Sequence, residues 1–264
     1  MALVFAAITP HSPLLLPTIA KDKADLLLPT RQAVLALEQE LYLTKPDTLL
    51  IMTPHGEGLP DAVSINYSEN YVADFSEFGD LVTSRKWRPD NLLIDRIRED
   101  FKTKQLPLTL TDSDTLDYGC GVPLVFLTAH LPNIRIVPLA VPRMDNKTHF
   151  RIGRELKDEI LKSTARIGVI ASADLSSRVT NDSPAGFSPR GVAFDERIIE
   201  LVKRHEHIGL LDVDQAWADE AQACGLPVLA TLFGLMEEIK HGSVIMSYER
   251  PLGVGYLVAH MTMP

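Results

Sequence analysis

Residues 2–13, ALVFAAITPHSP, decide the fold: an uninterrupted apolar run stops at a histidine held between two prolines. The pattern returns in residues 47–56, DTLLIMTPHG, where a second apolar run ends at Pro54-His55-Gly56. Continuous apolar runs bounded by turn residues are typical of strands buried on both faces of a sheet. The segment between the two runs carries leucines and alanines at helical spacing. Strand, helix and strand at this spacing predict a βαβ unit.

The rest of the chain continues this alternation. We expect helices at residues 90–105, with Asp90 as the cap, and at 122–131, 147–164, 194–205 and about 213–238. We expect strands at residues 135–141 and 166–172, and a C-terminal strand pair at 243–249 and 255–262. Residues 180–191, rich in Pro, Gly and Ser, are either a lid or a long surface loop that helps to form the pocket walls. With no internal repeat and no linker, residues 1–264 predict one α/β domain.

Charge and composition exclude several classes of protein. The net charge of −9 and the pI of 5.4 argue against a nucleic-acid partner, which needs a basic stripe. The longest basic cluster, residues 84–88, is interpreted as a solvated turn. No apolar stretch reaches the ~18 residues of a membrane helix, and the N-terminus does not resemble a signal peptide. Cys120 and Cys224 are too few for a disulfide framework. We therefore expect a cytoplasmic protein with no membrane partner.

The chemistry is expected at strand ends, because ligands of open α/β sheets bind outside the carboxyl ends of the strands. His11, His55, Asp174 and the turn at residues 117–121 all follow such ends. One histidine there is commonly a polar cap, but two in matching context favour a pair of metal ligands, and the flanking prolines fix the backbone. The other six are expected to be surface or packing residues: His130, His149, His205, His207, His241 and His260.

A third ligand has two candidates. Cys224 precedes the apolar run GLPVLATLFG, and the alternative interpretation is a buried core cysteine. Glu220, one turn earlier, is the carboxylate competitor, and its alternative is a solvated helix face.

These pieces together resemble the class III extradiol ring-cleavage dioxygenase superfamily, of LigB type, which includes the MEMO-like proteins. The nearest likeness is to the bacterial AmmeMemoRadiSam system protein B group. The resemblance rests on the order and spacing of segments that span nearly the whole chain. They are ITPHSPLLLP, KPDTLLIMTPHG, LDYGCGVPLVFL, IASADLSSRVTNDSPAGFSPRG, EAQACGLPVLATLFG and YERPLGVGY.

The resemblance implies a three-layer α/β/α domain around a mixed, largely parallel sheet, with a metal at one edge. In the dioxygenases two histidines and a glutamate hold Fe(II), and His11 and His55 match the histidine positions. The glutamate position falls on Cys224, as in MEMO-like members, which favours Cys224 over Glu220. Fe(II) is the metal that the resemblance implies most directly. Zinc or copper are alternatives, because a thiolate is softer than a carboxylate.

Two departures from the family pattern alter the proton-transfer residues. Relatives read DLSH where this chain has Asp174-Leu175-Ser176-Ser177, and a serine cannot replace the acid–base histidine at neutral pH. Relatives often read DHG where this chain has Tyr118, which donates a hydrogen bond but is a poor base. Asp174 either orients a ligand histidine through its other ring nitrogen or caps a helix.

Three functions are therefore open. The first is a dioxygenase that cleaves the ring of a catechol or aminophenol with O₂, with Tyr118, Asp174 and Ser177 as candidate catalytic residues. The second is a MEMO-like protein that keeps the fold, with or without the metal, does no ring cleavage and serves as a partner in a modification or signalling system. The third is a zinc hydrolase, which rests on ligand chemistry alone. A homo-oligomer is compatible with all three.

Overall fold

The structure is a computed structural model that describes residues 2–264. Its α-helices are α1 (Pro17–Ala20), α2 (Leu28–Leu43), α3 (Asn91–Thr103), α4 (Tyr118–Leu127), α5 (Asn146–Leu161), α6 (Pro189–Arg204), α7 (Gln215–Ala221) and α8 (Leu226–Met236). Its strands are β1 (Leu3–Thr9), β2 (Thr48–Thr53), β3 (Val63–Asn66), β4 (Tyr71–Phe75), β5 (Asp80–Pro89), β6 (Leu108–Thr111), β7 (Thr115–Leu116), β8 (Arg135–Ala140), β9 (Ile167–Ser172), β10 (Gly242–Glu249) and β11 (Tyr256–Thr262).

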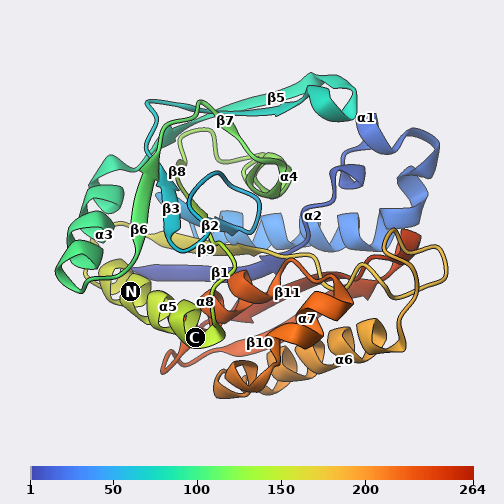
Figure 1. Ribbon diagram of the computed structural model, residues 1–264. Coiled ribbons are helices and arrows are strands. Elements are labelled where there is room, and N and C mark those ends of the chain that lie inside the picture. Colours follow the sequence, from blue (N-terminus) through green and yellow to red (C-terminus); the bar gives the residue numbers. More distant parts are fainter. Residues whose placement is uncertain (1) are drawn as a thin grey trace.

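The strands form one mixed sheet in the order β10-β11-β1-β9-β2-β8-β5-β4-β7, and β3 joins β8 to β6 (Figure 1). The central strands β1, β9, β2 and β8 are parallel to one another. β11 and β10 extend the β1 edge in antiparallel fashion, as the sequence predicts for the C-terminal pair. The expected α/β fold with a mixed, largely parallel sheet is confirmed.

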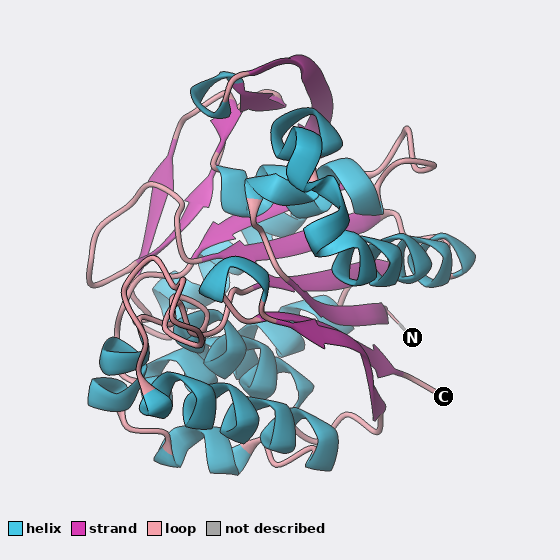
Figure 2. Cartoon of the chain, turned by 90° about the vertical axis from the view of Figure 1, so that its right-hand side faces the viewer, coloured by secondary structure: helices cyan, strands magenta, loops and turns pink. Residues whose placement is uncertain are grey.

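Helices cover both faces of the sheet, which explains the continuous apolar strands (Figure 2). In β1, Ala6 and Ile8 point into one buried core with α3, α5, α6 and α8, while Phe5 and Ala7 point into the other with α2 and α4. A strand between two helical layers needs apolar side chains at every position, so the twofold alternation of a half-exposed strand is absent.

Helices α5 and α8 pack unusually closely, and this fixes the position of α8. A Cβ atom at Gly153 would lie 2.0 Å from the carbonyl oxygen of Thr231. A Cβ atom at Gly234 would lie 2.0 Å from the carbonyl oxygen of Phe150. Only glycine permits this backbone approach at the two positions.

Three sequence expectations about helices need correction. Residues 213–238 are not one helical segment: Gln222 has φ 53° and ends α7, and α8 starts again with Pro227 in its first turn. The turn at residues 117–121 is the first turn of α4, because the carboxylate of Asp117 accepts a hydrogen bond from the Cys120 N–H. No helix begins at Asp174 in the described chain, so its interpretation as a helix cap is wrong.

The stretch between β2 and β8 contains structure that the sequence did not indicate. Residues 84–88 are not a turn but part of β5, which pairs with β4. The indole N–H of Trp87 donates to the hydroxyl of Thr128, so this basic stretch is tied to the end of α4. β3, β4, β6 and β7 have two to five residues each, too short to produce a readable period.

The loop at residues 180–191 packs on the chain near its C-terminal end. The hydroxyl of Ser183 donates to the carbonyl of Gly253, and a Cβ atom at Gly253 would lie 2.2 Å from Cα of Ser183. The walls of the two clefts described below come from other segments. It is therefore a packed surface loop rather than a wall of either cleft. No described helix is long and apolar enough to cross a membrane.

Candidate metal centre

Three neighbouring parallel strands end at the same edge of the sheet and deliver the polar residues of the site. His11 follows β1, His55 follows β2, and Asp174 follows β9 by two residues in each case. β9 lies between β1 and β2, with Thr9 opposite Ser172 and Met52 opposite Ala171. Residues from three distant parts of the sequence thus meet at one place because the register aligns the strand ends.

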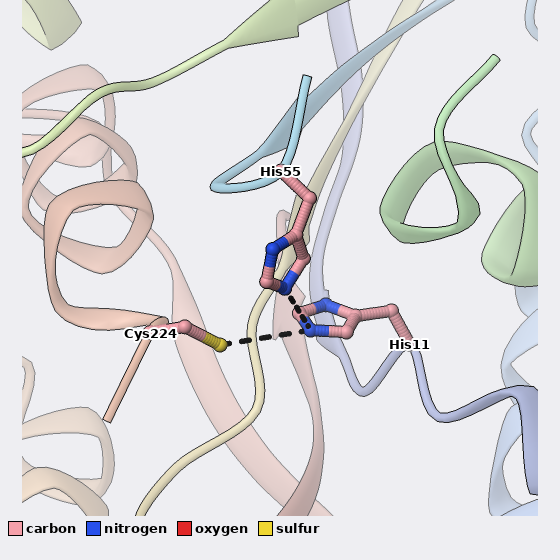
Figure 3. Close-up of side chains that lie close together, drawn as sticks. All are labelled: His11, His55 and Cys224. Atoms are coloured by element: carbon pink, nitrogen blue, oxygen red, sulfur yellow. Dashed lines mark hydrogen bonds between the residues drawn. The ribbon is translucent and has the colours of Figure 1, made fainter. Parts of the chain in front are cut away.

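His11, His55 and Cys224 point their ligand atoms at one another (Figure 3). The Nε2 atoms of the two imidazoles lie 3.1 Å apart, and Sγ of Cys224 lies 3.6 Å from Nε2 of His11. All three ligand atoms lie within 4.8 Å of one another. Metal bonds of about 2.0–2.3 Å place neighbouring ligands roughly 3.1–3.6 Å apart, so the two shortest separations fit one shared ion.

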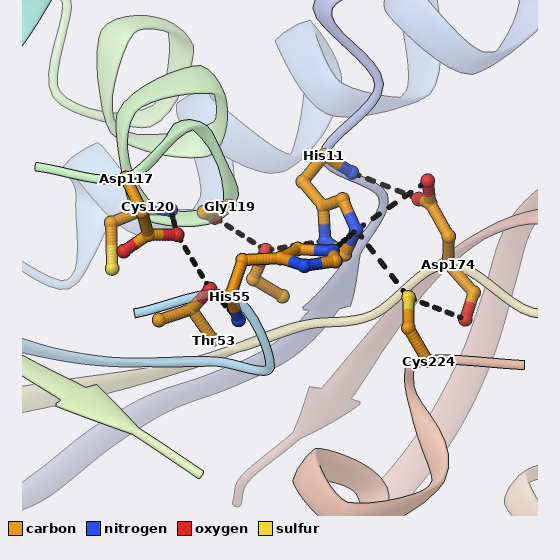
Figure 4. Close-up of polar contacts among 9 residues, drawn as sticks. His11, Thr53, His55, Asp117, Gly119, Cys120, Asp174 and Cys224 are labelled. Carbon is orange, nitrogen blue, oxygen red and sulfur yellow. Dashed lines mark hydrogen bonds and ion pairs between the residues drawn. The ribbon is translucent and has the colours of Figure 1, made fainter. Parts of the chain in front are cut away.

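The ring of His11 is held through its second nitrogen (Figure 4). Nδ1 of His11 lies 3.0 Å from the hydroxyl of Ser172, and that hydroxyl donates to the carbonyl oxygen of Gly119. Because the hydroxyl proton is used on Gly119, Nδ1 must be the donor to Ser172. Nε2 therefore carries the lone pair that faces His55 and Cys224, which is the tautomer a metal ligand needs. For His11, Ser172 and not Asp174 holds this nitrogen.

His55 is fixed through its backbone and through ring stacking. The hydroxyl of Thr53 accepts from the N–H of His55 at 3.1 Å and donates to Asp117 at 2.7 Å. The ring of Tyr118 stacks on His55 with centroids 4.7 Å apart and planes 27° apart. Asp117 also caps α4, so one carboxylate couples the helix start to the backbone of His55.

Cys224 lies in the break between α7 and α8 rather than inside a helix. The next residue, Gly225, donates its N–H to the carbonyl oxygen of Asp174 at 3.1 Å. A Cβ atom at Gly225 would lie 2.6 Å from the same oxygen, so only glycine allows the Cys224 segment to approach the β9 strand end this closely.

Asp174 stands beside the three ligand atoms. Its Oδ1 accepts the backbone N–H of His11 at 3.0 Å, and its Oδ2 lies 3.5 Å from Nε2 of His11. Burial raises the pKa of Asp174 to about 7. The carboxylate thus faces the same nitrogen that points at Cys224. Its Oδ2 is available there either as an oxygen ligand or as a proton acceptor.

Burial also sets the charge state of the three candidate ligands. It lowers the pKa of His11 and of His55 to about 4, so both imidazoles are neutral near pH 7. It raises the pKa of Cys224 to about 12, so the thiol keeps its proton unless a nearby positive charge stabilises the thiolate. Neutral imidazoles and a thiol beside a carboxylate form a donor set that fits a divalent cation.

Two clefts open on either side of the centre. One, of about 360 Å³, is lined by His55 and Tyr118 together with Glu57, Glu77 and Asp117. The other, also about 360 Å³, is lined by Cys224 together with Pro54, Arg143, Asp219 and Pro227, among other residues. A small aromatic ring therefore has space on the side where Tyr118 stacks on His55.

Two candidates from the sequence lie apart from this group. Glu220 forms an ion pair with Arg190 at 2.6 Å and is not among the converging ligand atoms, so Cys224 is the better third ligand. Ser177 donates its backbone N–H to the carbonyl of Ala221, and among the described residues its hydroxyl makes no hydrogen bond. Ser172 and Thr53 were missed by sequence reasoning, although both are the last residues of the apolar runs that end at the site.

Comparison with known families agrees with this geometry. Residues 5–259 match the family described as the catalytic LigB subunit of aromatic ring-opening dioxygenase. The chain belongs to the LigB family. The match spans nearly the whole chain and therefore includes all three candidate ligands.

The curated relatives are distant in sequence. Protein CA_C1420 of Clostridium acetobutylicum is 27% identical over 256 residues, which cover 94% of this chain and 55% of that protein. The 4,5-DOPA dioxygenase extradiol of Mirabilis jalapa is 24% identical over 170 residues, which cover 62% of each protein. The chain thus spans a little over half the length of the curated relatives it matches.

A solved structure shares the fold. The crystal structure of the uncharacterized protein JW3007 from Escherichia coli K12 aligns over 98% of this chain and 99% of that one, with a TM-score of 0.68 and 15% identity. At this identity the likeness supports the fold alone.

Proposed function

We propose that this LigB-family chain binds one divalent metal ion through His11, His55 and Cys224 and cleaves the ring of a small catechol or aminophenol with O₂. The observation that carries the proposal is the convergence of the three ligand atoms within 4.8 Å, with the lone pair of His11 directed by Ser172. Such an ion would supply a Lewis acid that gathers both ring oxygens and O₂. By family resemblance the ion is Fe(II), and the softer thiolate makes zinc or copper the alternatives.

The chain's own residues would bind and orient the aromatic ring. The cleft beside His55 offers the face and edge of the Tyr118 ring, which already stacks on an imidazole and can stack on a substrate. The phenol of Tyr118 has a pKa raised to about 12 by burial, so it stays protonated and donates a hydrogen bond. It would position a substrate oxygen rather than remove its proton.

A proton acceptor is needed because the relatives' histidine is replaced by Ser177. Asp174 is the carboxylate beside the centre, with Oδ2 3.5 Å from Nε2 of His11 and Oδ1 fixed by a backbone N–H. A substrate hydroxyl brought next to the three ligand atoms would lie within reach of Oδ2. We assign proton transfer from that hydroxyl to Asp174, which makes it the base of the reaction.

A second candidate function has its own support. Neither position 118 nor position 177 carries the imidazole that the family resemblance implies, and the match with Protein CA_C1420 covers only 55% of that protein. A MEMO-like protein that keeps the metal centre and acts with a partner in a modification or signalling system would account for both facts. A homo-oligomer is compatible with either function.

One experiment separates the two functions. Metal-free protein is loaded anaerobically with Fe(II), Zn(II) or Cu(II), and O₂ uptake and ring-opened product are followed with catechol, protocatechuate and 2-aminophenol. Ring cleavage predicts O₂ uptake by the Fe(II) form, abolished in His55→Ala and kept in His130→Ala, since His130 is exposed and pairs with Glu38. Metal binding without O₂ uptake on any substrate would reject ring cleavage and favour the partner function.

A further inference from the structure

A second group of histidines lies outside the candidate centre. His205 caps the C-terminus of α6 with a left-handed backbone conformation, φ 56°, and His207 comes two residues later. His241 lies between α8 and β10. The ring of His241 lies 4.9 Å from that of His205 and 5.0 Å from that of His207 between centroids, with planes 14° and 11° apart. Five of the eight histidines in the chain therefore belong to two clusters.

The His207–His241 contact resembles the His11–His55 contact in that two Nε2 atoms face each other, although the His207 and His241 rings are nearly parallel and the His11 and His55 rings are edge-to-face. The Nε2 atoms of His207 and His241 lie 3.4 Å apart. Nδ1 of His241 lies 2.8 Å from the carbonyl oxygen of Ile239, to which it must donate because a carbonyl only accepts. The lone pair of His241 is therefore on Nε2 and faces His207. Two metal–imidazole bonds of about 2.0–2.1 Å in tetrahedral geometry separate the nitrogens by about 3.4 Å.

The surroundings favour a soft or borderline metal ion. A small hollow beside the pair is also lined by the thioether residues Met236 and Met261, which are buried. The nearby carboxylate of Glu206 is engaged by Arg197 and Arg204. Imidazole and thioether ligands, with no free carboxylate in these contacts, suit copper(I) and zinc rather than magnesium or calcium.

The cluster lies toward the opposite edge of the sheet from His11. β10 begins at Gly242, which pairs with Thr262, and the neighbouring Met261 pairs with Ala6 of β1. His241 therefore lies toward the N-terminal end of β1, while His11 follows its C-terminal end. The two clusters can be tested independently.

We propose that His207 and His241 form a second metal site, for a transition-metal ion that prefers imidazole. Nε2 of each ring is a ligand, and the carbonyl of Ile239 fixes the tautomer of His241 as Ser172 does for His11. His205 stacks on His241 and positions its ring without binding the ion. Met236 and Met261 supply thioether contacts that favour copper(I) over zinc. Without an ion, the pair is held by one N–H···N hydrogen bond.

The test is a metal titration of the full chain made metal-free, by equilibrium dialysis against Zn²⁺ and, separately, anaerobic Cu⁺. The wild type and His130→Gln should bind two equivalents, while His207→Gln and His241→Gln lose one. His205→Asn, which tolerates the left-handed backbone, should keep both. Met236→Leu should weaken the second site for Cu⁺ and leave Zn²⁺ unchanged if the thioether is a ligand, and thermal unfolding confirms that each variant is folded.

Three results would overturn the site. They are one equivalent in the wild type that the His207 and His241 variants still bind, full binding by both of these variants, or loss of every equivalent in Cys224→Ser. A second test needs no variant. Crystals soaked in Zn²⁺ should give an anomalous peak between His207 and His241. A peak only at His11 would contradict the proposal.

Discussion

The thiol of Cys224 lies 3.6 Å from Nε2 of His11, although 213 positions separate the two residues. Two structural devices create this contact. The parallel register of β1, β9 and β2 brings His11 and His55 to one edge. The break between α7 and α8, pressed against Asp174 at Gly225, brings the cysteine to the same edge. The site therefore depends on both the sheet and a helix interruption.

Removing the hydroxyl of Ser172 should weaken metal binding without altering any ligand. In Ser172→Ala, Nδ1 of His11 loses its partner, so the ring is free to rotate or to change tautomer. We expect metal affinity to fall about 10–100-fold. The control is Ser247→Ala, because the buried hydroxyl of Ser247 has no hydrogen-bond partner among residues 2–264. Equal affinities in the two variants would contradict the role of Ser172.

Asp174→Asn should separate proton transfer from metal binding. The amide oxygen can still accept the N–H of His11, but the side chain can no longer take a proton. We expect unchanged metal content and a fall in kcat of about 10²–10⁴-fold. Asp95→Asn, on the exposed face of α3, is the matched control. Wild-type turnover in Asp174→Asn would remove this residue from the mechanism.

Ser177→His tests whether the missing imidazole limits the reaction. Its backbone is fixed by the carbonyl of Ala221 and its hydroxyl makes no hydrogen bond in the described chain, so no side-chain contact is lost. If ring cleavage is the function, product formation should rise, by up to about 10²-fold at the low end of general-base effects. Product formation that appears only in the variant would instead assign the wild type to the partner function.

The sequence predicted the parts of this structure that depend on long apolar runs and their ends. Both faces of β1 and β2 are buried, so their runs are continuous and the histidines that follow them stand out. The short strands between β2 and β8 escaped detection because two to five residues carry no readable period. Residues 84–88 were misread because β5 pairs beside solvent, where charged side chains are tolerated.

The side-chain partners within the site could not be read from the sequence. Which group holds Nδ1 of His11 depends on the register between β1 and β9, and that register places Ser172 rather than Asp174 under the ring. The convergence of Cys224 depends on the left-handed residue Gln222, whose side-chain type gives no signal for it. Tertiary packing determines both contacts.

Acid should destabilise the fold through His149. Burial lowers its pKa to about 4, and its Nε2 accepts the N–H of Met144. Between pH 6.5 and 4 the unfolded chain binds the proton that the folded chain excludes. The contribution of neutral His149 to the free energy of unfolding is therefore fully present above pH 6.5. It is lost as the pH falls, by up to about 3 kcal/mol. Denaturant unfolding at several pH values should show a shallower fall in His149→Gln than in His130→Gln, and equal slopes would contradict this.

X-ray absorption spectroscopy of the metal-loaded protein tests the central claim most directly, because it reports the ligand atoms around the ion. To isolate the candidate centre, the measurement uses His241→Gln loaded with one equivalent of Zn²⁺. We predict two nitrogen scatterers at about 2.0–2.1 Å and one sulfur at about 2.3 Å, with the sulfur lost in Cys224→Ser and kept in Cys120→Ser. A spectrum with only nitrogen and oxygen neighbours would show that His11, His55 and Cys224 do not share an ion.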